Sequence, residues 1–121
     1  MSLKNYYYLL AQTLRGLDEA HERFLELQRK NPRLSPGEQT RIQIEMAELE
    51  AAWQKVYQET QAAAHRTMTV TPPSIDDLRQ SKEIADRLEQ MAAKANTIKD
   101  VVAATADIMS IWNKTNPQPK G

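Results

Sequence analysis

Apolar residues recur along most of this chain at alternating steps of four and three, the spacing that places side chains on one face of an α-helix. The first such run spans residues 3–30 and consists of Leu3, Tyr7, Leu10, Leu14, Leu17, His21, Phe24 and Gln28. Four further residues widen the apolar stripe on one side: Tyr6, Thr13, Ala20 and Leu27. This helix is therefore expected to contact two neighbours, and Asn31-Pro32 ends it because the residue before a proline disfavours helical dihedral angles.

A second helix is predicted over residues 36–66. The tetrapeptide Ser35-Pro36-Gly37-Glu38 combines a serine N-cap, a proline in the first helical position and a glutamate that completes a capping box. The apolar positions that follow are Ile42, Met46, Leu49, Trp53, Val56, Thr60 and Ala63. Because the link to the first helix is short, the two should form an antiparallel hairpin, each arm about 45 Å long.

Residues 67–73 are predicted to be extended, since β-branched residues alternate there and Pro72 and Pro73 prevent a helix from continuing. The segment is either a simple connection or an exposed strap that offers an edge to a peptide. Ser74 then caps a third helix over residues 74–113, with Asp77 as a weaker capping-box partner than glutamate.

The third helix carries the longest uninterrupted seam in the chain. Its members are Ile84, Leu88, Met91, Ala95, Ile98, Val102, Thr105, Met109 and Trp112. Neither proline nor glycine interrupts it, and the spacing keeps phase across Asn96, which favours one helix of about 60 Å. Such a helix exceeds the hairpin, so either it bends around residues 95–97 or its end projects and needs another surface to cover it.

The end of this third helix is the predicted interface. Beyond Ile98 its apolar residues are no longer confined to one face, and a helix that is apolar on several sides is usually buried on several sides. The expected interface residues are Ile98, Val101, Val102, Thr105, Ile108, Met109 and Trp112. Tyr8 joins them as an exposed aromatic, because three consecutive tyrosines cannot all face one side of a helix.

These elements predict one all-α domain over residues 1–114, a three-helix bundle or coiled-coil-like domain, followed by a disordered tail at residues 115–121. The 121 residues and the 40% apolar content are typical of a single soluble domain. Three glycines and a single phenylalanine disfavour a many-stranded sheet. The proline-bearing, polar tail from Asn116 to Gly121 has little to bury.

Charge and composition narrow the function classes. Sixteen basic and sixteen acidic residues cancel, without a segment of one sign, which disfavours nucleic-acid binding. The least charged stretch, residues 101–112, is too short for the roughly 20 apolar residues of a membrane span. The N-terminus does not resemble a signal peptide and the chain has no cysteine, so we expect a soluble, cytoplasmic protein.

Candidate chemistry does not survive comparison with simpler structural roles. Asp18, His21, Glu22 and Glu48 would suggest a bundle metal site, but such sites need a second Glu-x-x-His, and His65 falls near the opposite end of the hairpin. As candidate nucleophiles, Ser35 and Ser74 are explained by helix capping. Ser81 and Ser110 have no nearby histidine in the predicted fold to activate them. We therefore expect neither metal nor cofactor, and no enzymatic activity.

The function predicted from the sequence is a non-enzymatic helical interaction module that self-associates through the end of its third helix. Two alternatives involve other partners. A small binding, neutralising or chaperone-like protein would recognise a secreted effector and be monomeric alone. A structural subunit of a secretion or phage assembly would polymerise through the same helix end.

Overall fold

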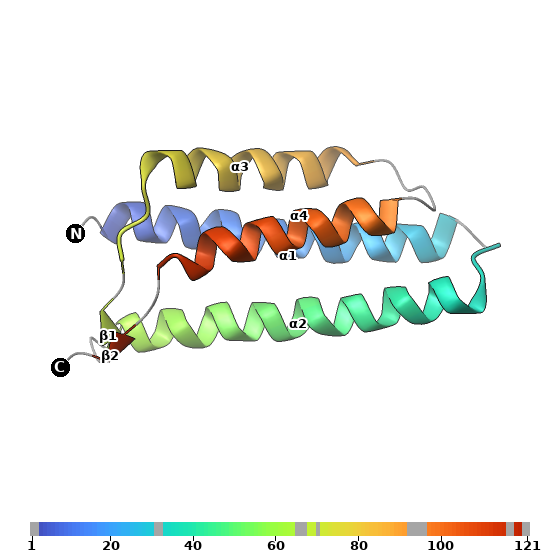
Figure 1. The fold of residues 1–121 in the computed structure, drawn as a ribbon, viewed down its shortest axis with the longest axis horizontal. Coiled ribbons are helices and arrows are strands. Elements are labelled where there is room, and N and C mark those ends of the chain that lie inside the picture. Colours follow the sequence, from blue (N-terminus) through green and yellow to red (C-terminus); the bar gives the residue numbers. More distant parts are fainter. Residues whose placement is uncertain are drawn as a thin grey trace.

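The chain folds as an all-helical bundle in the computed structural model, which describes residues 3–30, 33–64, 68–69, 71–91, 97–115 and 118–119. Within these ranges there are four helices: α1 (Leu3–Lys30), α2 (Pro36–Ala64), α3 (Ile75–Gln90) and α4 (Thr97–Asn113). Two short strands, β1 (Met68–Thr69) and β2 (Gln118–Pro119), pair antiparallel beside one end of the bundle. The helices alternate in direction along the chain (Figure 1).

α1 is the central element, because it packs against each of the other three helices. It runs antiparallel to α2 and α4 but parallel to α3 (Figure 1). The ion pair of Arg15 with Asp86 and the hydrogen bond from Arg23 to the Glu89 carbonyl fix the parallel register. α4 contacts both α1 and α2, whereas α2 and α3 do not meet within the described residues.

The predicted third helix is two antiparallel helices, so the bundle has four helices where three were expected. α3 ends at Gln90, and its C-cap Met91 is extended, with φ −65° and ψ 134°. The Met91 amide donates to the Leu88 carbonyl at 3.3 Å, which closes the last turn. α4 then runs back along α1, so no helix projects past the hairpin (Figure 1). Thr97, the last residue of the predicted bend at 95–97, begins α4, whereas residues 92–96 lie outside the described ranges.

Both predicted helix starts are confirmed. The Glu38 amide donates to Ser35 Oγ at 3.2 Å, and Glu38 Oε1 accepts from the Ser35 amide at 3.1 Å. The same reciprocal pair joins Ser74 and Asp77, at 3.0 Å and 3.3 Å. Each capping box satisfies amides that have no partner within the helix.

The buried face of α1 combines two residues of the predicted seam with the whole of the predicted widening stripe. The fully buried residues of this helix are Tyr6, Leu9, Thr13, Gly16, Leu17, Ala20, Phe24 and Leu27. Tyr7 is exposed, and Leu10, Leu14 and His21 are half-buried. The residues of the widening stripe are the more deeply buried because α1 packs against three helices, where the sequence predicted two neighbours.

The described residues after α4 contact other parts of the chain, although the sequence predicts a disordered tail at residues 115–121. Thr115 is buried, and its carbonyl accepts from the Thr71 amide at 2.6 Å. Further on, Gln118 pairs with Thr69 in the two-stranded sheet. Thr69 and Thr71, which precede α3, therefore contact Gln118 and Thr115. The predicted end of the second helix at residue 66 lies outside the described ranges.

Candidate functional site

The residues predicted to form an interface at the end of the third helix lie inside the bundle. Ile98, Val101, Ile108 and Trp112 are at most 5% exposed; the other three, Val102, Thr105 and Met109, are half-buried. An interface through them would require α4 to leave the core. The expectation rested on an overhanging helix, which the turn after Gln90 removes. Tyr8, by contrast, is 40% exposed on α1.

Trp112 is held by a network that joins α4 to α2. Its ring centroid lies 5.5 Å from that of Tyr6, and its Nε1 donates to Glu59 Oε2 at 3.2 Å. Lys55 Nζ bridges Glu59 at 2.7 Å and Asn113 at 2.8 Å. Burial raises the pKa of the Tyr6 hydroxyl, with Thr60 acting in the opposite direction. A tryptophan in this setting stabilises the fold.

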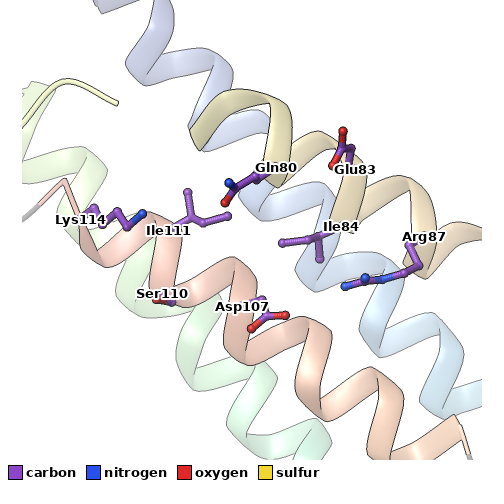
Figure 2. Close-up of a pocket in the computed structure, with 8 residues that line it drawn as sticks. All are labelled: Gln80, Glu83, Ile84, Arg87, Asp107, Ser110, Ile111 and Lys114. Atoms are coloured by element: carbon purple, nitrogen blue, oxygen red, sulfur yellow. The ribbon is translucent and has the colours of Figure 1, made fainter. Parts of the chain in front are cut away.

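A polar groove of about 280 Å³ runs between α3 and α4. Figure 2 shows Ile84 and Ile111 pointing toward one another between the two helices, with charged and polar side chains around them. The lining residues are Gln80, Glu83, Ile84, Arg87, Asp107, Ser110, Ile111 and Lys114. Charges of both signs alternate here, and Lys114 is already paired with Asp77 at 3.1 Å. Ser110 has no histidine among these neighbours to activate it.

A second, more apolar groove of about 220 Å³ lies between α1 and α2. Its lining comes equally from the two helices: Leu17, Asp18 and His21 from α1, and Leu49, Glu50 and Trp53 from α2. A neighbouring depression shares Glu50 and Trp53 and extends outward along α2 to Gln54. The antiparallel hairpin creates the groove, because neither helix alone supplies both walls.

Aromatic rings continue this groove toward the end of the bundle where α1 begins. The Trp53 and Tyr57 rings stack at 5.4 Å and 15°, one helical turn apart on α2. Tyr57 is 44% exposed, and Tyr7 on α1 is 47% exposed. We call this side of the hairpin the open face and define it by Asp18, His21, Glu50, Trp53 and Tyr57.

The open face carries acidic charge without a matching cation. Asp18 and Glu50 form no ion pair with any residue in the described ranges, whereas Glu22 farther along α1 is paired with Arg29 at 3.2 Å. The opposite situation holds between α1 and α3, where Arg15 meets both Asp86 and Glu89. His21 is half-buried in the same groove.

The apolar spacing in the sequence does not predict this surface. That spacing places Trp53 on the core-facing side of the second helix and does not single out Tyr57. The usable signal was the aromatic pair at i and i+4, which stacks on a helix surface. Asp18 and His21 were considered for metal binding, yet no cluster of three or more metal-ligating side chains occurs in the part of the chain that the structure describes. His65 lies outside it.

No protein-family model, no curated protein and no solved structure matches the chain. Among the described helices, none combines the length and the apolar character needed to cross a bilayer. Of the two grooves between described helices, the one between α1 and α2 is the more apolar.

Proposed function

We propose that this protein is a non-enzymatic helical interaction module that binds another protein through the open face of α1 and α2. The observation that carries the proposal is the stacked Trp53–Tyr57 pair beside an apolar groove that no described helix covers. Tryptophan and tyrosine dominate the energetics of protein interfaces because they bury large rigid surfaces. α4 already packs on the α1–α2 pair elsewhere, so a partner helix on the open face would complete a second helix-in-groove contact.

Charge favours a different protein as the partner over a second copy of this chain. A two-fold dimer uses the same patch on both subunits. Asp18 and Glu50 would then meet the same carboxylates of the other copy in the groove where the two pack. Like charges facing one another across an interface oppose association. A binding or chaperone-like role thus has better support than the self-association predicted from the sequence.

The absence of enzymatic activity remains part of the proposal, and the grooves support it. The α1–α2 groove holds His21 without a serine or lysine beside it, and the α3–α4 groove holds Ser110 without a histidine. A hydroxyl or amine nucleophile needs a base within hydrogen-bond reach to activate it.

The proposal is tested by comparing partners of the wild type with those of a Trp53→Ala/Tyr57→Ala variant. Proteins captured by the wild type would be purified and retested singly, and their footprint mapped by hydrogen exchange. We expect protection on α1 and α2 and loss of binding in the variant. Ile44→Ala, which removes an exposed apolar side chain elsewhere on α2, is the matched control. Partners that bind the double variant as well as the wild type would refute the proposal.

A further inference from the structure

The floor and walls of the α1–α2 groove differ in character. Leu17 and Leu49 are buried at its base, Trp53 flanks them half-buried, and Asp18 and Glu50 stand one on each helix. The apolar base is suited to aliphatic side chains. The carboxylates, which come from different helices, set the charge that an occupant must meet.

An uncharged apolar occupant would desolvate this pair of carboxylates without replacing their hydrogen bonds to water. Covering Asp18 and Glu50 removes water from ionised groups, and such desolvation is costly unless a cation replaces the water. Neither arginine nor lysine occurs among the described residues that line the groove. The partner therefore has to bring it.

Arginine or lysine fits the remaining geometry. A guanidinium group binds carboxylates with paired, charge-assisted hydrogen bonds, and a tryptophan ring is the strongest aromatic platform for a cation. Glu50 and Trp53 are three residues apart on α2 and line the same groove, so one cationic side chain would reach both.

We infer that the open face binds a basic amphipathic helix of a partner protein, with apolar side chains on Leu17 and Leu49 and a cationic side chain between Asp18, Glu50 and Trp53. This inference rests on the proposed function and adds the chemical class of the partner. A helix is the occupant that matches a groove between two packed helices, because side-chain ridges on one helix fill the groove between others.

Synthetic helical peptides test the inference. Three peptides of about 18 residues would each span the face. One carries leucines on one side and arginines beside them, the second has glutamates in place of those arginines, and the third keeps the arginines but lacks the leucines. Each is titrated into the ¹⁵N-labelled full chain, and the Trp53 indole signal is assigned with Trp53→Phe.

We expect the leucine–arginine peptide alone to bind and to shift the Trp53 signal. Asp18→Asn/Glu50→Gln should weaken its affinity at least about tenfold and reduce its salt dependence. Glu83→Gln/Asp107→Asn, the same change of charge in the α3–α4 groove, should leave affinity unaltered.

Two results with the leucine–arginine peptide would overturn the inference. One is equal binding of the leucine–arginine peptide by Asp18→Asn/Glu50→Gln, and the other is absence of binding by that peptide. Binding of the glutamate peptide at Trp53 would also refute the basic partner while leaving the open face as an interface. Failure of the proposed function is recognised separately, by captured partners that ignore Trp53→Ala/Tyr57→Ala.

Discussion

Gly16 shows how a single residue sets the distance between helices. By helix propensity alone Gly16 should destabilise α1, since glycine inside a helix is about 1 kcal/mol less favourable than alanine. In the bundle, a Cβ at this position would collide with Ile108 Cδ1 and would touch Ala85 at 3.9 Å. We expect Gly16→Ala to lower the free energy of unfolding by about 1–2 kcal/mol, because overpacking outweighs the gain in helix propensity. Urea denaturation measures the change.

A double-mutant cycle with Ile108→Val provides the control. Valine lacks the Cδ1 atom that meets the added methyl group. Gly16→Ala should therefore cost less stability in the Ile108→Val background than in the wild type. The two substitutions are therefore expected to be less damaging together than the sum of their separate effects. Stabilisation by Gly16→Ala alone would mean that α1 and α4 do not approach this closely.

At the scale of elements, local chemistry predicted where helices begin but not where the third one turns. Ser35 and Ser74 act within their own four residues, and both capping boxes form. The turn after Gln90 has no comparable signal, because the apolar spacing keeps phase and neither proline nor glycine intervenes. Tertiary burial decides it: α4 is apolar on several sides, and folding back lets α1, α2 and α3 each cover one.

Asp77 links the start of α3 to the end of α4 and makes the bundle sensitive to acid. Burial opposes ionisation of this carboxyl, but hydrogen bonds from Lys114 and Ser74 outweigh it and lower its pKa. A lowered pKa in the folded state stabilises the protein above the unfolded pKa of about 4. That stability is lost as pH falls through the folded value. Wild-type melting temperature should therefore drop more steeply below about pH 4 than that of Asp77→Asn.

At neutral pH we expect Asp77→Asn to cost about 1 kcal/mol, the usual value of a helix cap and its charge. Asp76→Asn is the matched control, because Asp76 is exposed on the same turn and pairs with Arg79 within α3. Melting curves of the three proteins between neutral pH and pH 3 would decide. Parallel pH profiles for Asp77→Asn and the wild type would contradict the role assigned to Asp77.

At the scale of the molecule, the sequence predicts an interface at residues 98–112, where apolar side chains occur on several sides of the helix. In the fold most of these side chains lie in the core. Trp112 is completely buried against Tyr6 and Glu59. The open face was not predictable in the same way, because Asp18 and Trp53 are far apart in sequence and meet through the hairpin register. Trp53 is only half-buried because no described helix covers the groove between α1 and α2. A local sequence pattern does not show whether another helix will cover such a groove.

The same two carboxylates predict the oligomeric state of the whole chain. If Asp18 and Glu50 oppose a two-fold contact through the open face, the wild type should sediment as a monomer at micromolar concentration. Asp18→Asn/Glu50→Gln removes the repulsion but keeps the apolar groove and the Trp53–Tyr57 stack, so it should self-associate more strongly. Glu83→Gln/Asp107→Asn changes the net charge equally on the other groove and should stay monomeric. A wild-type dimer that the Asp18→Asn/Glu50→Gln change weakens would show instead that these carboxylates bind cations of a second copy, and self-association would regain its place as the function of this surface.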